Sequence, residues 1–289
     1  MRQLEEFQAY FFRGLSGIYN DNEKKILFRI LLEDIFDLPE IEISSKKHVK
    51  ISEEQLEVLK QSLTQLKSGK PIQLITGLTY FYGDKYYTSP HALIPRPETE
   101  ELVDKVLRDI DNKQSSTLRI IDIGTGSGCI AISLKKKLPN STVYALDVSK
   151  EALLTAKKNA GKHAVDIHFI QADILKWAGI FENQHFDIIV SNPPYIQQRE
   201  KKEMEKNVLN YEPHLALFVP DEAPLLFYDA IADFAQSHLS HEGKIYFEIN
   251  QRLGQEVLSL LKTKNFSSLD LFQDMHGADR IVLAKREIF

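Results

Sequence analysis

Apolar residues recur at helical spacing along the N-terminal part of the chain. This spacing predicts amphipathic helices over residues 4–19 and 23–37. Ser52 and Gln55 have the spacing of a capping box, and a third helix with one leucine-lined face is expected to follow them. Residues 1–72 are therefore predicted to form a small all-helical domain.

Residues 78–88 have no helical period and are rich in aromatic residues. Two β runs flank Gly83 and Asp84, which predicts a hairpin within a linker of residues 73–95. A helix is then expected to begin near Pro97 and to run through Ile110, with acidic residues of its first turn facing the positive end of the helix dipole.

Beyond a polar stretch at residues 111–117, which is expected to form a loop, short β runs and helical patterns alternate. The β runs lie at residues 119–123, 142–146, 166–170 and 186–191, and the helical patterns at residues 129–138 and 150–162. This alternation is typical of βαβ units, in which helices cover both faces of a mostly parallel sheet. The predicted fold class is therefore α/β.

The end of the chain continues this pattern with one difference. A helix is expected at residues 224–239, a strand at residues 244–249 and a second helix at residues 253–262. The last β runs, at residues 269–272 and 280–284, are close enough in sequence to pair as a hairpin, which would add an antiparallel strand at the end of the sheet. The charged residues 197–206 are expected to form a solvated, partly helical loop.

The composition places few further limits on this fold. The chain has 289 residues, of which 43% are hydrophobic and 27% charged, a balance typical of one large or two modest soluble domains. Its formal net charge of -5 argues against a protein that holds duplex nucleic acid mainly through phosphates. A protein or small-molecule substrate is therefore favoured.

Cys129 is the single cysteine, which excludes an internal disulfide and any cysteine-based zinc site, and no other metal signature is present. It is expected to be a small buried residue at a helix start rather than a nucleophile, since no histidine is its evident partner. The first residues contain Glu5 and Glu6 and no long apolar core, so neither a secretory signal nor a membrane span is expected there. A cytoplasmic protein is predicted.

Three glycines follow the first β run of the α/β region. Gly124, Gly126 and Gly128, with Thr125 and Ser127 between them, form a turn from a strand into a helix, where backbone can approach a ligand closely. The spacing differs from the dinucleotide fingerprint, and no Walker lysine follows. A nicotinamide or a nucleoside triphosphate is therefore disfavoured.

The next two strand ends each carry a carboxylate. Asp147 can accept hydrogen bonds from both ribose hydroxyls of an adenosine. Asp173 is suited to the adenine amino group, with Ile174 against the ring. Together with the glycine turn, these parts suit S-adenosylmethionine as the cofactor. Each part alone also has a structural explanation: a tight connection for the glycines, a helix cap for Asp147 and the start of a turn for Asp173.

The fourth strand stops at Asn192, Pro193, Pro194 and Tyr195, because prolines lack the N–H that continues a ladder. A conjugated NH2 group is a poor nucleophile, and it attacks better when acceptors hold both of its N–H bonds. The Asn192 side-chain oxygen and a proline carbonyl are predicted to accept those bonds, and Tyr195 to offer an apolar face to a planar amide or base.

No carboxylate of this motif is placed as a strong base. Orientation is therefore expected to carry most of the catalysis, with Asn192, Pro193 and Tyr195 as catalytic residues and the nitrogen's proton lost to solvent. Taken alone, an Asn-Pro pair is also the pattern of a turn that ends a strand.

These stretches resemble S-adenosylmethionine-dependent methyltransferases that act on a planar amino nitrogen of adenine or glutamine. Residues 93–100, preceded by residues 73–77 and 81–83, are similar to the PrmC/HemK family of protein-(glutamine-N5) methyltransferases. The resemblance extends over essentially the whole chain and implies a Rossmann-like class I methyltransferase domain at residues 96–289. One departure lies at residues 219–225, where many members carry Gly-x-Asp-Gly-Leu.

The resemblance implies methyl transfer from S-adenosylmethionine to the glutamine of the Gly-Gly-Gln motif of class I peptide-chain release factors, which modulates translation termination. Asn192 and the Pro193 carbonyl would hold the glutamine NH2, with Pro194 and Tyr195 beside it and Arg96 near the mouth; Asn192 would also border the cofactor.

The helical domain at residues 1–72 would bind the release factor. The protein is expected to be a monomer that uses no metal and contacts neither nucleic acid nor a membrane. Two residues of the resemblance also have a structural explanation: capping of the following helix for Arg96 and the fixing of a loop for Glu212.

Three other functions share part of this pattern. A related glutamine methylase acts on a ribosomal protein, and only the overall pattern of the N-terminal domain favours release factors. An adenine-N6 nucleic-acid methyltransferase would flip its base and need a basic recognition face, whereas the helical domain mixes acidic and basic residues in no evident stripe. A binding protein that uses the cofactor only as a brace has no need for the Asn-Pro-Pro-Tyr stretch.

Overall fold

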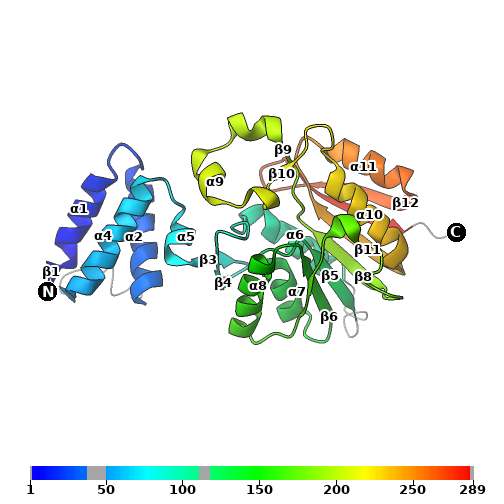
Figure 1. Ribbon diagram of the computed structural model, residues 1–289, viewed down its shortest axis with the longest axis horizontal. Helices are drawn as coiled ribbons and strands as arrows, with labels where there is room; N and C mark the ends of the chain where they lie inside the picture. The colour runs from blue at the N-terminus through cyan, green and yellow to red at the C-terminus, as the bar shows by residue number, and fades with distance from the viewer. Residues whose placement is uncertain (1, 38–49, 111–117, 287–289) are drawn as a thin grey trace. The chain divides into compact units, whose positions relative to one another are not determined.

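The computed structural model describes residues 2–37, 50–110 and 118–286 (Figure 1). These residues divide into two compact units. One holds the residues up to Leu78 together with Glu205–Tyr211, and the other holds Thr79–Met204 and the residues from Glu212 onward. The predicted loop at residues 111–117 lies outside the described residues.

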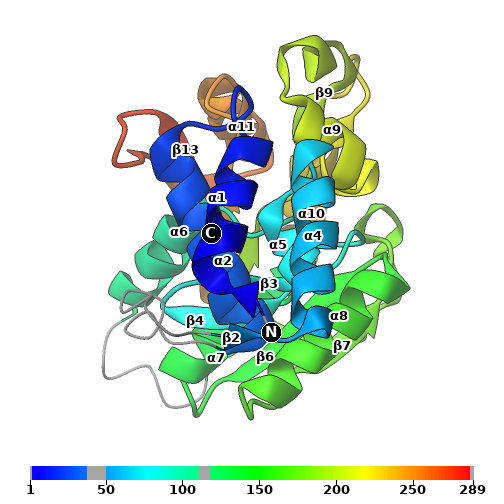
Figure 2. The same ribbon diagram turned by 90° about the vertical axis from the view of Figure 1, so that its left-hand side faces the viewer.

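The first unit is built from helices around one apolar core. Helices α1 (Leu4–Gly14), α2 (Asp21–Phe36) and α4 (Glu53–Lys67) pack side by side (Figure 2), and the short α5 (Ile72–Thr76) follows. The predicted apolar faces of α1 and α4 are confirmed, and their buried residues include Phe7, Phe11, Leu59 and Leu63. The face of α2 differs from the expected spacing of Ile26, Ile30, Leu31 and Ile35, because Ile26 is 49% exposed and Phe28 and Leu32 are buried beside Leu31. One feature was not indicated by the hydrophobic pattern: strands β1 (Arg2–Gln3) and β2 (Lys50–Ile51) pair antiparallel.

Local chemistry sets the ends of these helices. The predicted capping box is confirmed, since the Gln55 backbone N–H donates to Ser52 Oγ at 3.0 Å and the Ser52 N–H donates to Gln55 Oε1 at 2.8 Å. A second capping box at Asn20 starts α2 at Asp21, before the predicted start at residue 23. Helix α1 ends at Gly14 and not near residue 19, because the chain turns there and Gly17 has a φ of 80°.

The second unit begins with the hairpin and helix that the sequence predicts. Strands β3 (Leu78–Phe81) and β4 (Asp84–Tyr87) pair with each other, and Gly83 in their turn has a φ of 79°. Helix α6 (Pro97–Arg108) starts with a proline in its first turn, as expected.

A seven-stranded sheet forms the centre of this unit within the described residues, in the order β12-β13-β11-β8-β5-β6-β7. The strands are β5 (Arg119–Ile123), β6 (Thr142–Asp147), β7 (His168–Gln171), β8 (Phe186–Ser191), β11 (Leu239–Glu248), β12 (Phe266–Gln273) and β13 (Asp279–Arg286). Strands β7, β6, β5, β8 and β11 are parallel, whereas β13 pairs antiparallel with both β11 and β12. The predicted terminal hairpin and antiparallel strand are therefore confirmed.

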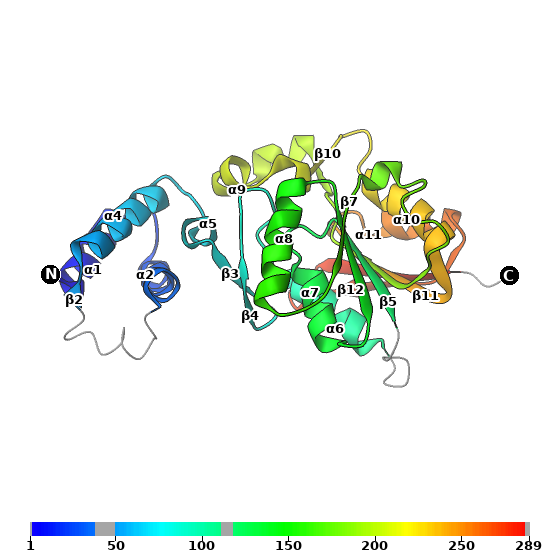
Figure 3. The same cartoon turned by 60° about the horizontal axis from the view of Figure 1, so that its bottom comes forward.

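Helices cover both faces of this sheet, as Figure 3 shows. Helices α6, α7 (Cys129–Lys137) and α8 (Lys150–Lys162) lie on one side, and α10 (Leu226–His238) and α11 (Gly254–Thr263) on the other. Ile120 and Ile188 pack into the core between the sheet and helices α6, α7 and α8. Their neighbours Ile121 and Ile189 pack into the core between the sheet and helices α10 and α11. These strands are apolar at successive positions because both of their faces are buried.

The charged segment after β8 is partly helical, as predicted. It contains a short strand β9 (Ile196–Gln197), the 3-10 helix η2 (Gln198–Glu203) and helix α9 (Lys206–Tyr211). Strand β9 pairs in parallel with β10 (Phe218–Val219). In the described part of the chain, no helix has the length and hydropathy needed to cross a membrane.

Gly128 provides a test of the packing between α7 and α8. It precedes α7 with a φ of 82°, and a Cβ placed there would lie 3.0 Å from the Ala156 Cβ of α8. Gly128→Ala should lower the free energy of unfolding by about 1–3 kcal/mol through backbone strain and crowding. Urea unfolding followed by circular dichroism measures this loss.

Gly179→Ala is the matched control, because Gly179 has a φ of 85° and no atom within 4 Å of the added Cβ. It should show the backbone cost alone. Equal losses in the two variants would show that the approach of α8 to Gly128 is not tight.

Candidate active site

The site lies where neighbouring parallel strands end. Ile123 at the end of β5 pairs with Leu146 of β6 and with Ser191 of β8. The Gly124 and Thr125 N–H groups donate to the Leu146 carbonyl at 2.8 and 3.0 Å, and Ser191 Oγ donates to the Ile123 carbonyl at 2.6 Å. These bonds hold the glycine turn, the end of β6 and the start of the Asn-Pro-Pro-Tyr stretch at one edge of the sheet.

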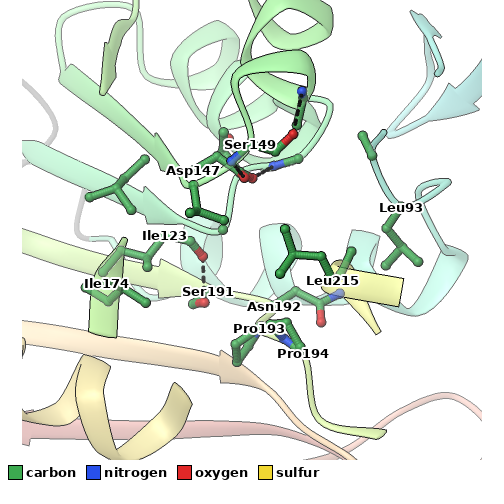
Figure 4. Close-up of a pocket in the computed structure, with 18 of the residues that line it drawn as sticks. Leu93, Ile123, Asp147, Ser149, Ile174, Ser191, Asn192, Pro193, Pro194 and Leu215 are labelled. Carbon is green, nitrogen blue, oxygen red and sulfur yellow. Dashed lines mark hydrogen bonds between the residues drawn. The ribbon is translucent and has the colours of Figure 1, made fainter. Parts of the chain in front are cut away.

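A cavity of about 370 Å³ opens at this edge, within the size range of small-molecule sites. Most of the residues predicted to form a site line it: Arg96, Gly124, Thr125, Gly126, Ser127, Asp147, Asp173, Ile174, Asn192, Pro193 and Pro194. Figure 4 shows Asp147 and Ser149 across the cavity from Asn192, Pro193 and Pro194. Two predicted residues, Gly128 and Tyr195, are not among the lining residues.

The glycine turn exposes backbone to this cavity. Gly124 and Gly126 have φ values of 76° and 56°, and no atom lies within 4 Å of a Cβ placed on Gly124. A side chain there would fill open space that a ligand can occupy. Gly128 serves a different purpose, because it allows α7 and α8 to pack closely.

Asp147 is held by two backbone N–H groups, one from the glycine turn and one from the residue that caps α8. Its Oδ2 accepts the Gly126 N–H at 2.8 Å and its Oδ1 accepts the Ser149 N–H at 2.9 Å. Burial raises the pKa of this carboxyl above its usual range. Ser149, and not Asp147, caps α8, since Ser149 Oγ accepts the Ala152 N–H. Each carboxylate oxygen keeps a lone pair for a ligand hydroxyl.

Asp173 starts the 3-10 helix η1 (Ile174–Lys176), where its Oδ1 accepts the Leu175 N–H at 3.0 Å. This turn is the structural arrangement that its sequence position also allowed. Ile174 is buried and lines the cavity beside it, and the half-exposed Val148 and Leu175 add apolar surface. The region between Asp147 and Asp173 thus combines carboxylates with apolar side chains.

Asp122 was assigned no role from the sequence, yet it organises the glycine turn. It is fully buried next to the last residue of β5, and its Oδ2 accepts a hydrogen bond from Thr125 Oγ1 at 2.6 Å and from the Ala131 N–H at 3.2 Å. Desolvation raises its pKa to about 7. The Asp122 carboxyl group therefore joins the glycine turn to the first residues of α7 through these two hydrogen bonds.

The acceptor motif is divided between the cavity and the protein interior. Asn192 lines the cavity, and its Nδ2 donates to Thr99 Oγ1 of α6 at 3.2 Å. Tyr195 instead packs against the apolar core, and its hydroxyl donates to Glu248 Oε1 at 3.4 Å. The structure thus brings Asn192 and both prolines to the cavity and leaves the ring of Tyr195 outside it.

Arg96 and Glu212 join two loops at the cavity. Glu212 is buried, and its carboxylate accepts Arg96 Nη2 at 2.5 Å and the Ile94 N–H at 3.1 Å. Arg96 is the N-cap residue of α6 by position, but its side chain makes no capping hydrogen bond. Its side chain is 36% exposed, so this residue keeps a charged surface at the cavity.

Cys129 is a buried first residue of α7, as predicted. Burial raises the pKa of its thiol to about 12, which leaves almost no thiolate near neutral pH. No group of three or more His, Cys, Asp or Glu side chains that could hold a metal ion is found in the part of the chain that the structure describes.

Comparison with known proteins agrees with this geometry. Residues 103–212 match the methyltransferase small domain, and residues 8–77 match the PrmC N-terminal domain. Among solved structures, a methyltransferase from Pyrococcus furiosus is similar with a TM-score of 0.53 and 17% identity, covering 79% of this chain and 100% of that one. The matched domain and the fold place the chain among the Rossmann-like methyltransferases.

Two relatives narrow this class. The chain is 47% identical over 280 residues to the release factor glutamine methyltransferase of Flavobacterium psychrophilum, covering 96% of this chain and 98% of the relative. It is 41% identical to the enzyme of the same name from Bacteroides thetaiotaomicron, covering 98% of this chain and 100% of the relative. The chain belongs to the release factor glutamine methyltransferase family, which confirms the resemblance seen in its motifs.

The raised pKa of Asp122 predicts a pH-dependent stability. Because the folded state binds this proton more tightly than the unfolded state, between the ordinary value of 3.8 and about 7, the free energy of unfolding should fall as pH rises. Asp122→Asn removes this contribution. Urea unfolding at about pH 5 and about pH 8 measures the free energy of unfolding of both proteins. The value for the wild type minus the value for the variant should be smaller at the higher pH. A constant difference would mean that Asp122 ionises near its ordinary pKa.

Proposed function

We propose that this protein transfers a methyl group from S-adenosylmethionine to the side-chain amide nitrogen of the glutamine in the Gly-Gly-Gln motif of class I release factors. The observation that carries the proposal is the placement of Asn192, Pro193 and the glycine turn around one cavity. The names and full-length coverage of the two relatives support the choice of substrate.

The residues around the cavity suit S-adenosylmethionine. The open space over Gly124 suits a ligand at the helix N-terminus, Asp147 suits ribose hydroxyls, and Ile174 suits an adenine ring. A 16S rRNA methyltransferase from T. Thermophilus has a similar fold, with a TM-score of 0.53 and 17% identity over 73% of this chain and 50% of that one. That structure is in complex with AdoMet and guanosine. When bound, S-adenosylmethionine supplies an electrophilic methyl group, so that the nitrogen lone pair forms the N–C bond while the C–S bond breaks and sulfur keeps its electrons.

Asn192 prepares the acceptor nitrogen. Its Nδ2 is engaged by Thr99, so its Oδ1 is the atom left to accept a hydrogen bond from the glutamine NH2. The Pro193 carbonyl is proposed to accept the second N–H. These two bonds direct the nitrogen lone pair toward the methyl group, and the nitrogen's proton passes to solvent after transfer.

The helical unit is proposed to bind the release factor away from the tripeptide, because three residues offer little area for specificity. Its described surface carries the half-exposed apolar side chains of Tyr10, Ile18 and Ile26, which suit a protein partner. The KM for the folded factor should therefore be far lower than the KM for a short Gly-Gly-Gln peptide. Equal KM values would contradict docking outside the tripeptide.

The activity is tested with S-adenosylmethionine that carries a labelled methyl group. Label should enter a class I release factor and should be absent when the tripeptide glutamine is replaced by alanine. Ribosomal-protein extract and DNA serve as parallel substrates. The proposed substrate would be overturned if label entered the ribosomal-protein extract or DNA but not the release factor, or if it entered none of the three.

Replacement of the acceptor-binding amide should separate turnover from cofactor affinity. Asn192→Ala should lower kcat by about 100-fold or more, because it removes the group that orients the nitrogen. The Kd for S-adenosylmethionine, measured by calorimetry, should change little.

Asp147→Asn gives the converse pattern and serves as the matched comparison. Loss of a charged acceptor should raise the Kd for the cofactor by about 10- to 100-fold and leave kcat at saturating cofactor nearly unchanged. Parallel losses of affinity and turnover in both variants would contradict the division of roles.

A further inference from the structure

The amide of Asn192 is the first member of a hydrogen-bonded series that leads into the protein. Its Nδ2 donates to Thr99 Oγ1 at 3.2 Å, and Thr99 Oγ1 donates to Glu248 Oε2 at 2.6 Å. We call these three residues the relay. Asn192 directly follows β8, Thr99 lies in the first turn of α6, and Glu248 is the last residue of β11. Thr99 and Glu248 are each at most 3% exposed.

The position of Glu248 follows from the sheet. Phe247 of β11 pairs with Ser191 of β8, so Glu248 and Asn192 are the next residues at the same sheet edge. The other carboxylate oxygen of Glu248 accepts the Tyr195 hydroxyl at 3.4 Å. Glu248 thus contacts, directly or through Thr99, both polar side chains of the Asn-Pro-Pro-Tyr stretch.

The number of hydrogens sets the direction of the relay. A threonine hydroxyl has one hydrogen, and an ionised carboxylate can only accept. With its hydrogen given to Glu248, Thr99 Oγ1 offers only lone pairs to Asn192. Only the NH2 end of the Asn192 amide can bind those lone pairs, so Oδ1 must point the other way.

Resting on the proposed function, we propose that Thr99 and Glu248 are positioning residues that hold the Asn192 amide with Oδ1 toward the substrate nitrogen. Without this constraint the Asn192 amide can rotate and present its NH2 group to the substrate. Two donors then face each other, and the substrate N–H bond has no acceptor. The relay therefore selects the acceptor orientation before the substrate enters.

The ionisation of Glu248 controls this direction. A protonated Glu248 can donate to Thr99, and Thr99 can then donate to Asn192 Oδ1, which reverses the amide. Burial raises the pKa of Glu248 to about 7. Several other titratable or charged groups interact electrostatically with the Glu248 carboxyl group. They are Glu98 of α6, Cys129 of α7, Tyr195, Tyr228 of α10 and Arg280 of β13. Arg280 lowers this pKa, and Glu98 raises it.

Thr99→Val tests the relay, because valine has the same shape without the hydroxyl. It should lower kcat for release-factor methylation by about 10- to 100-fold, with the KM for S-adenosylmethionine unchanged. Thr99→Ser restores the hydroxyl and should recover most of kcat. Thr79→Val, at another buried threonine outside the site, is the matched control and should retain wild-type kcat.

Glu248→Gln adds a pH readout that a purely structural role does not move. Wild-type kcat should fall as pH drops below about 7, whereas the variant should be slow and lack this acidic limb. Wild-type kcat in Thr99→Val, or an unchanged acidic limb in a folded Glu248→Gln variant, would overturn the relay. Failure of the wild-type protein to methylate any release factor would instead overturn the proposed function.

Discussion

Parallel pairing of β6, β5, β8 and β11 is the constraint on which the rest of the site depends. The register places Leu146, Ile123, Ser191 and Phe247 side by side, so the residues that follow them emerge at one edge of the sheet. In sequence these residues are spread over about two thirds of the α/β region, and no local interaction joins them. The Ser191 hydroxyl and the Leu146 carbonyl then fix the strand ends to one another.

Two buried carboxyl groups extend this constraint to the loops. Asp122 ties the glycine turn to α7, and Glu248 ties α6 to the acceptor motif. Both have pKa values raised to about 7, because burial disfavours their charged forms. Such groups are costly for folding. Asp122 accepts the Thr125 hydroxyl of the glycine turn, and Glu248 reaches the Asn192 amide through Thr99. The molecule thus places its buried polar groups where orientation matters for ligand binding.

The two units divide these demands. The helical unit has its own apolar core around Phe11 and Leu59, separate from the two cores on either side of the sheet. The rigid sheet edge holds the parts that must be aligned within fractions of an ångström, whereas the helical unit offers surface that can be used for a partner.

The sequence by itself determined the order of the longer helices and strands, the glycine turn and the Asn-Pro-Pro-Tyr stop, because periodicity, glycine spacing and proline chemistry act over a few residues. It also placed Asp147, Asp173 and Asn192 at strand ends, which the structure brings to one cavity. It did not indicate the short pairs β1–β2 and β9–β10 or the five-residue helix α5. It did not show that Tyr195 turns into the core, that Glu212 binds Arg96, or that Thr99 and Glu248 contact the acceptor motif. Those contacts join residues more than 50 positions apart, and only the sheet order and the packing of α6 against it decide which side chains meet.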